Sequence, residues 1–253
     1  MEPVYRALEA VTAGIRLVQG TRLHVEGLDN IPARGGVLAI NHTGYVDFLP
    51  VGLALKQRGR RARFMVKSEL TDVAIMRFLV AQTGSLPVDR SAGSDAYRAA
   101  VAALRSGELV AVYPEATISR SFEPKEFKTG AVRMAVEAGV PVTPVIVWGA
   151  QRQLSKGTER NVGRARIPIH TVFGTPLTFG PRDDALEATH RLREAMIAQL
   201  HRVQDMYPEA PAGADWLPAR LGGSAPTPEE ALVIEDAEAR EKAARRAAKR
   251  QSE

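Results

Sequence analysis

Cysteine is absent from this chain of 253 residues. Its absence excludes disulfide bonds, a thiolate metal site and a cysteine nucleophile, so any group transfer must use other side chains. The chain also lacks an unbroken apolar stretch of the roughly 20 residues that a spanning helix requires. Its longest apolar region, residues 134–149, is interrupted by Glu137, Pro141 and Pro144. We therefore expect no membrane span.

Several functional signatures are missing as well. The N-terminal segment has no secretory signal pattern, so a cytoplasmic location is expected. The five histidines have no metal-ligand spacing, and no serine elbow is present. The chain shows neither a phosphate-binding glycine-rich loop nor an alternation of basic and aromatic residues for single-stranded RNA. We expect neither a metal ion nor a nucleic acid as a partner.

With 45% hydrophobic and 25% charged residues, the chain is long enough for one sizeable core and does not require two domains. The net charge is +5 at pH 7. This excess indicates an anionic partner, such as phospholipid headgroups, a phosphorylated substrate, coenzyme A or nucleic acid. Charge alone does not choose among them.

Strand-like and helix-like segments alternate between residues 21 and 179. The strand-like segments are 23–25, 37–40, 62–66, 85–88, 109–113 and 140–148. Helical patterns begin at Asp47 and cover 70–80, 93–105 and 129–138. This order predicts an α/β single domain with a largely parallel or mixed central sheet flanked by helices. Ligands of such sheets bind beyond the carboxyl ends of the strands.

The pattern divides the chain into four parts. Residues 1–20 form an amphipathic helix, which packs either on the protein's own core or on a membrane. Residues 21–205 form the main domain and end in a helix over 183–203. A linker rich in proline and glycine covers 206–228, and its Thr227 and Glu230 have the spacing of a capping box. Residues 229–253 form a charged helical or disordered tail, whose basic end, 242–250, is either solvated or bound to anionic lipid.

A histidine that follows the second strand-like segment precedes an aspartate by five residues. The segment is Val37-Leu38-Ala39-Ile40-Asn41-His42-Thr43-Gly44-Tyr45-Val46-Asp47. Residues five apart on a helix point about 140° away from each other, so these side chains meet only if His42 lies outside the helix. The spacing then predicts a base, His42, oriented by Asp47. Alternatively, Asp47 is only a helix N-cap and His42 a hydrogen-bonded loop residue.

A second polar loop follows residues 109–113. Pro114 ends that strand by removing a backbone donor, which places Glu115 and Thr117 on a loop. Glu115 is suited to bind substrate hydroxyls, and Arg120 to bind a phosphate through its planar guanidinium group. The alternative is an ordinary solvated turn.

Basic residues also lie beside other strand ends, and these are Lys67, Arg90 and Lys128. They surround His42 with positive charge if the sheet brings their loops together. Otherwise each is a surface cation.

Four sequence blocks occur in a familiar order. They are Asn41 to Asp47, with the form Asn-His-x4-Asp; Lys67-Ser68-Glu69-Leu70 with Gly84-Ser85-Leu86-Pro87-Val88-Asp89-Arg90; Tyr113-Pro114-Glu115-Ala116-Thr117; and Val140-Pro141-Val142-Thr143-Pro144-Val145. Together they resemble the glycerolipid acyltransferase family, specifically the 1-acylglycerol-3-phosphate acyltransferases. The resemblance covers residues 27–179.

The resemblance implies an enzyme that moves a fatty acyl group to the free hydroxyl of lysophosphatidic acid, forming phosphatidic acid. The donor would be a thioester of coenzyme A or acyl-carrier protein, with no other cofactor. His42 would be the general base and Asp47 its orienting acid, and the acceptor would be held by Glu115, Thr117, Lys67, Arg90, Arg120 and Lys128. The chemistry agrees, because a hydroxyl that attacks a thioester needs a base with a pKa near neutrality.

Two departures from the family pattern stand out. The third block usually continues Glu-Gly-Thr-Arg-Ser, whereas Ile118 occupies the arginine position here. We hypothesise that Arg120 replaces that arginine, helped by Arg90 and Lys128. The N-terminal segment is also short for a membrane-docking element, so peripheral, partly electrostatic attachment to the cytoplasmic side of an anionic membrane is expected.

Two alternatives accompany this hypothesis. The same fold and base would also acylate another lysophospholipid, a glycolipid or an amino-lipid. A non-catalytic lipid-binding protein on the same fold is the other alternative.

Overall fold

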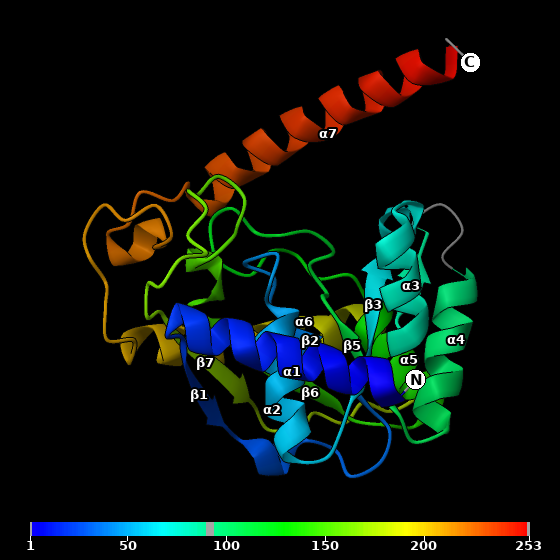
Figure 1. The fold of residues 1–253 in the computed structure, drawn as a ribbon. Helices are drawn as coiled ribbons and strands as arrows, with labels where there is room; N and C mark the ends of the chain where they lie inside the picture. The colour runs from blue at the N-terminus through cyan, green and yellow to red at the C-terminus, as the bar shows by residue number, and fades with distance from the viewer. Residues whose placement is uncertain (1, 90–93, 252–253) are drawn as a thin grey trace.

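A computed structural model describes residues 2–89 and 94–251 of the chain (Figure 1). Its centre is a seven-stranded sheet with the order β1-β7-β6-β2-β5-β3-β4. The strands are β1 (Arg22–Glu26), β2 (Gly36–Ile40), β3 (Ala62–Lys67), β4 (Leu86–Val88), β5 (Leu109–Val112), β6 (Val142–Trp148) and β7 (Pro168–Phe173). The expected mixed α/β sheet flanked by helices is confirmed.

One strand pair reverses the direction of the sheet. β6 and β7 are antiparallel, whereas every other neighbouring pair is parallel. Five strands therefore end on the same side, which we call the carboxyl side of the sheet, and β1 and β7 run the opposite way. Loops that follow β2 and β5 emerge next to each other on the carboxyl side, because these strands are direct neighbours.

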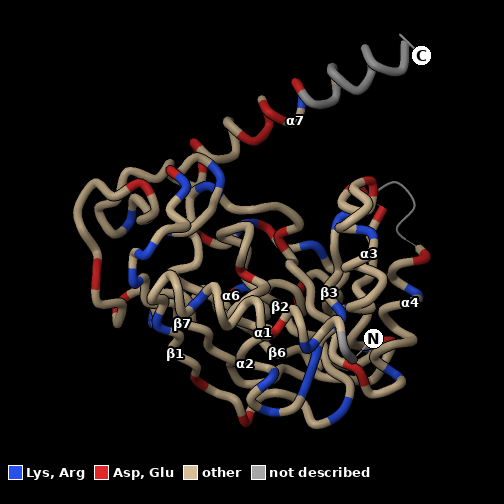
Figure 2. Tube along the Cα trace, viewed as in Figure 1, with Lys and Arg blue, Asp and Glu red and all other residues tan. Residues whose placement is uncertain are grey.

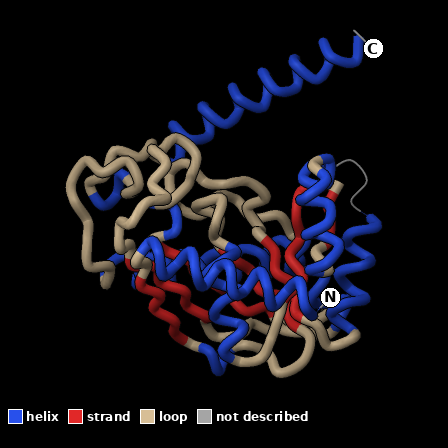
Figure 3. Tube along the Cα trace, in the orientation of Figure 1, coloured by secondary structure: helices blue, strands red, loops and turns tan. Residues whose placement is uncertain are grey.

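Helices cover both faces of the sheet (Figure 3). One face packs against α4 (Ser94–Arg105), α5 (Gly130–Ala138) and α6 (Ala185–Asp205), which bury residues such as Leu104, Met134 and Leu192. The other face packs against α2 (Phe48–Gln57) through Val51 and Leu55. β2 lies between the two cores with all five residues buried, and its end is therefore held firmly in place.

The N-terminal helix α1 (Glu2–Gln19) lies against α2 and α3 (Ala74–Thr83) and crosses the molecule in front of the sheet (Figure 1). Its contacts with the body are partly polar. Glu9 is buried and pairs with Lys56 at 3.4 Å and with Arg61 at 3.2 Å. This docking leaves Val11, Ile15 and Val18 exposed.

The C-terminal helix α7 (Pro228–Gln251) begins at a capping box, as predicted. The Thr227 backbone N–H donates to Glu230 Oε2 at 2.9 Å, and the Glu230 N–H donates to Thr227 Oγ1 at 3.3 Å. Figure 1 shows the helix projecting away from the body. The backbone of residues 242–250 is helical, but most side chains there lie outside the structural description.

The elements differ from the sequence expectations in two places. The segment 70–80 is not one helix, because Val73 has an extended backbone and separates a 3₁₀ turn, η2 (Ser68–Asp72), from α3. β7 was not anticipated, although it pairs with β6, the strand that precedes it in the chain. Among residues 2–89 and 94–251, no helix is long and apolar enough to span a bilayer.

Candidate active site

His42 and Asp47 meet on the carboxyl side, in the loop between β2 and α2. His42 Nδ1 lies 3.2 Å from Asp47 Oδ2. The backbone N–H groups of Thr43 and Gly44 donate to the same oxygen, each at 2.8 Å. The Asp47 side chain turns back into the loop and makes no N-cap hydrogen bond. Asp47 therefore contacts the imidazole ring directly, and its side chain does not cap α2.

Burial is unequal between the two partners. The Asp47 side chain is fully buried, whereas the His42 side chain remains 19% exposed. Burial raises the pKa of Asp47, while its contact with His42 and the two backbone donors act in the opposite direction. An acceptor at Nδ1 favours the tautomer with a proton on that nitrogen, which leaves a lone pair on Nε2. This geometry suits a general base, and the imidazole is partly accessible to solvent.

The imidazole ring is also packed against an aromatic face. The rings of His42 and Tyr113 are stacked, with centroids 4.0 Å apart and planes inclined by 20°. Burial, followed by the negative charge of Asp47, raises the pKa of Tyr113 well above its usual value. The tyrosine is therefore neutral, and it limits the orientations of the histidine ring.

Glu115 supports the backbone of His42. The His42 N–H donates to Glu115 Oε1 at 2.8 Å, and the Lys125 N–H donates to Oε2 at 3.2 Å. Burial raises the pKa of Glu115 to about 7, although both backbone hydrogen bonds act to lower it. Glu115 joins two loops at the site, and its role in binding substrate hydroxyls stays a prediction.

The remainder of the β5 loop wraps around the same histidine. The Ser119 N–H donates to the His42 carbonyl oxygen at 2.8 Å. The preceding residue, Ile118, is buried. Ala116 has a positive φ of 62°, a conformation that favours glycine. α6 fixes the far end of the loop, because Arg193 donates to the carbonyl oxygens of Pro124 and Lys125.

The predicted cations lie at different distances along the sheet. Lys67 ends β3, two strands from β2, and pairs with Glu69 at 2.8 Å. Lys128 is exposed, and its backbone N–H donates to the Pro114 carbonyl oxygen at 2.9 Å, next to Glu115. Arg90 lies outside the described residues. The β2 and β5 loops are thus brought together, whereas Lys67 is farther along the sheet.

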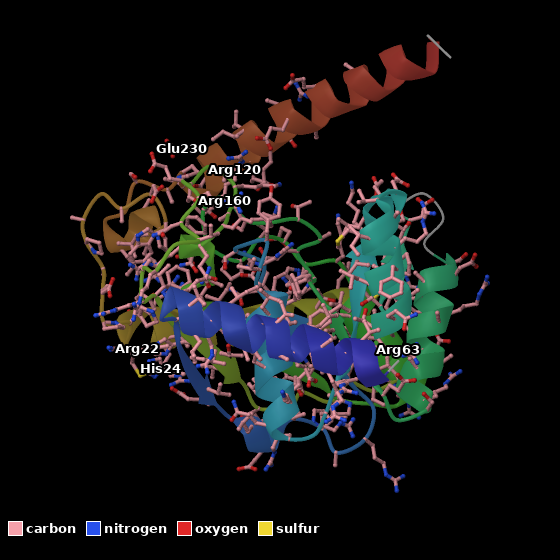
Figure 4. The ribbon with its side chains drawn as sticks, in the orientation of Figure 1. Arg22, His24, Arg63, Arg120, Arg160 and Glu230 are labelled. Atoms are coloured by element: carbon pink, nitrogen blue, oxygen red, sulfur yellow. The ribbon has the colours of Figure 1, made fainter. Side chains whose placement is uncertain are left out.

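Arg120 and Thr117 face the start of α7. Arg120 forms an ion pair with Glu238, and Figure 4 places it below that helix. Thr117 Oγ1 accepts a hydrogen bond from Lys125 Nζ, which also pairs with Glu235 at 2.7 Å. Lys125 was missed at the sequence level, although its position between the third block and Lys128 offered a signal. Among the described residues, no three potential ligands gather to hold a metal ion.

The match to a family model decides the assignment. Residues 22–148, half of the chain, match the model described as Acyltransferase. The chain belongs to the acyltransferase family. The match contains both loops of the site and ends with β6. The family resemblance carried by the four sequence blocks is thereby confirmed.

Relatives in this acyltransferase family have moderate identity to the chain. The 1-acyl-sn-glycerol-3-phosphate acyltransferase LPAT1, chloroplastic, of Arabidopsis thaliana is 27% identical over 73% of this chain and 52% of its own length. The Bacillus subtilis (strain 168) 1-acyl-sn-glycerol-3-phosphate acyltransferase is 29% identical over 48% of this chain and 60% of its own length. The human 1-acyl-sn-glycerol-3-phosphate acyltransferase alpha is 25% identical over 86% and 76%. The chain thus spans about half the length of the chloroplast relatives.

A solved acyltransferase structure has the same fold. The crystal structure of the 1-acyl-sn-glycerophosphate (LPA) acyltransferase PlsC from Thermotoga maritima aligns with a TM-score of 0.62. The alignment covers 83% of this chain and 86% of that chain at 22% identity. This likeness independently supports the single α/β domain.

Proposed function

We propose that this acyltransferase moves a fatty acyl group from a thioester to the free hydroxyl of 1-acylglycerol-3-phosphate, forming phosphatidic acid. The observation that carries the proposal is the contact between His42 and the buried Asp47 at the end of β2. The names of its relatives support the choice of acceptor. The donor is a thioester of coenzyme A or acyl-carrier protein.

His42 acts as the general base in the proposed reaction. Its Nε2 takes the proton of the acceptor hydroxyl while the hydroxyl oxygen attacks the thioester carbonyl carbon. The carbon–sulfur bond then breaks, an ester forms, and the thiolate leaves with the proton returned from the imidazolium. Asp47 holds the ring through Nδ1 and stabilises the imidazolium in between. No residue becomes acylated in this sequence.

Positioning supplies much of the remaining rate. A single general base contributes typically about 10²- to 10⁴-fold, so the two bound substrates must also be held in a reactive geometry. Glu115 contributes by fixing the His42 backbone. Thr117, Arg120 and Lys128 lie on the same β5 loop and bind substrate. Lys67 and Arg90 provide positive charge from the neighbouring strand exits.

The test is release of free thiol from palmitoyl-coenzyme A, with and without lysophosphatidic acid. We expect release that depends on the acceptor and yields phosphatidic acid. The matching acyl-carrier-protein thioester, assayed in parallel, identifies the donor. Release only with another lysophospholipid, a glycolipid or an amino-lipid would replace the acceptor, and absence of turnover with every pair would contradict the function.

We also propose peripheral attachment to the cytoplasmic side of an anionic membrane through α1. Its exposed Val11, Ile15 and Val18 form one helical face, and α3 beside it exposes Ile75 and Phe78. Apolar side chains of this kind enter the interfacial region of a bilayer. Arg6 and Arg16 within the helix and Arg22 just after it add attraction to anionic lipid.

Vesicle binding tests the attachment. Val18→Asp places a charge on the apolar face of α1, so binding to vesicles that contain anionic lipid should weaken. Leu186→Asp is the matched control, because Leu186 is similarly exposed at the start of α6. Binding that resists both Val18→Asp and high salt would contradict the proposal.

A further inference from the structure

Three cations gather below the first turns of α7. Arg120 pairs with Glu238, and Lys125 Nζ lies 2.7 Å from Glu235 Oε2. The Lys125 and Glu235 side chains are only 15% and 16% exposed. Figure 2 shows the acidic positions along the first half of α7, above basic positions of the underlying loops. The pairing therefore lies in a half-buried contact between the tail and the body.

Lys156 completes the cluster from a third segment of the chain. Burial lowers its pKa, the charges of Glu235 and Glu238 act to raise it, and those of Lys125 and Arg120 act to lower it. The loop approaches Arg120 closely, since a Cβ added to Gly157 would lie 2.7 Å from Arg120 Nη1. Five charged groups from three segments thus act on one another.

Hydrogen bonds link this cluster to the site around His42. Lys125 donates from its backbone to Glu115 and from Nζ to Thr117. Arg120 follows Ser119, whose N–H donates to the His42 carbonyl oxygen. Lys156 follows Ser155, whose hydroxyl donates to the Thr43 carbonyl oxygen. A ligand on the three cations would therefore lie beside the proposed catalytic loop.

The carboxylates of α7 satisfy the cations incompletely. Arg120 Nε and Glu235 Oε1 are buried without a hydrogen-bond partner. Three cations face two carboxylates, Glu235 and Glu238, so the cluster retains positive charge. A phosphate monoester carries close to two negative charges and presents three strong acceptor oxygens. One of these oxygens could accept from Arg120 Nε, the buried donor that the two carboxylates leave without a partner.

We infer that Arg120, Lys125 and Lys156 form a phosphate-binding site, which Glu235 and Glu238 of α7 occupy when substrate is absent. This inference deepens the proposed function and rests on it. An incoming phosphate group displaces both carboxylates and releases the first turns of α7 from the body. The group belongs either to the lysophospholipid acceptor or to coenzyme A, since both carry phosphate esters.

Steady-state kinetics of the full chain give the first test. E235Q/E238Q removes the competing charges, so the KM for the substrate that carries the bound phosphate should fall about three- to tenfold. Lys156→Gln should raise the same KM. E229Q/D236N is the matched control, because both side chains are exposed on α7. Varying lysophosphatidic acid and palmitoyl-coenzyme A separately identifies the phosphate.

A label on α7 gives a second test that does not require turnover. The chain has no cysteine, so Ala239→Cys places a single nitroxide at an exposed position of the helix. Glycerol 3-phosphate, or adenosine 3′,5′-bisphosphate for the coenzyme arm, should increase label mobility, whereas glycerol should not. The same label should already be mobile in E235Q/E238Q.

The two failures are distinguishable. If wild-type protein turns over but E235Q/E238Q changes neither KM nor label mobility, the phosphate site is wrong and the proposed function stands. If no acceptor is acylated by the wild type, the proposed function fails. If the mobility of the label is also unchanged by both phosphate esters, the phosphate site is wrong as well.

Discussion

The loops after β2 and β5 meet at His42 but act on different parts of it. Asp47, on the β2 loop, contacts the imidazole ring. Glu115 and Ser119, on the β5 loop, bind the backbone N–H and carbonyl of the same residue. Two buried carboxylates in one site are therefore not equivalent. One contacts the imidazole ring, and the other binds the backbone that carries the ring.

The largest effect is expected for the ring itself. His42→Ala removes the proposed base, so kcat should fall about 10²- to 10⁴-fold. Thiol release from palmitoyl-coenzyme A in the presence of lysophosphatidic acid measures the loss. His190→Ala, at an exposed position of α6, is the control and should retain full activity. Full activity of His42→Ala would show that His42 is not the base.

Substituting each carboxylate separates the contact with the ring from the contact with the backbone. Asp47→Asn removes the charge that stabilises the imidazolium, so kcat should fall about 10²-fold or more. Glu115→Gln keeps one acceptor for the backbone, so its kcat should fall less. Both variants are compared by thiol release at saturating substrates. An equal loss in the two variants would show that ring and backbone contacts are not separable.

The contribution of Glu115 to the free energy of unfolding should depend on pH. Its pKa is raised from 4.5 to about 7, so the folded state holds a proton that the unfolded state loses. The contribution of this group to stability is fully present below about pH 4.5 and is lost as pH rises through about 7, a change of about 3 kcal/mol.

Urea unfolding at several pH values measures this change. The difference in unfolding free energy between wild type and Glu115→Gln should vary between pH 4.5 and 7. It should be constant at higher pH. A difference that does not vary with pH would contradict the raised pKa.

The smallest effect concerns the backbone of the β5 loop. Ala116→Gly removes a side chain from a residue with φ of 62°, which should stabilise the protein by up to about 1 kcal/mol. Urea unfolding measures the gain. Ala116→Ser retains a Cβ and should show no such gain. Destabilisation by glycine would mean that the loop is held without strain.

The sequence predicted local relationships well. His42 and Asp47 are five residues apart, and a strand end followed by a turn suffices to bring them together. Thr227 and Glu230 are equally local, and their capping box is present. The α/β alternation also predicted the sheet, because buried parallel strands are short apolar runs separated by helices.

Contacts between distant segments were not predictable in the same way. Lys125 and Glu235 are 110 residues apart, and nothing in either local pattern pairs them. Both oxygens of Glu115 accept backbone hydrogen bonds that depend on how two loops pack, and its local sequence does not indicate them. β7 was also missed, and one of its two partners, β1, lies near the other end of the chain.

The antiparallel direction of β7 determines on which side of the sheet α6 begins and ends. After β7, Leu177 pairs with Val142 at the start of β6, on the side away from His42. The 21 residues of α6 then span about 30 Å and bring the chain back, so that Tyr207 contacts Pro168 at the opposite side. If β7 were parallel to β6, it would end on the carboxyl side of the sheet, where α6 now ends. The same helix would then carry the C-terminal segment away from His42. The direction of β7 therefore places the start of α7 on the side of Arg120 and Lys125. Glu238 and Glu235 of α7 can then pair with these cations.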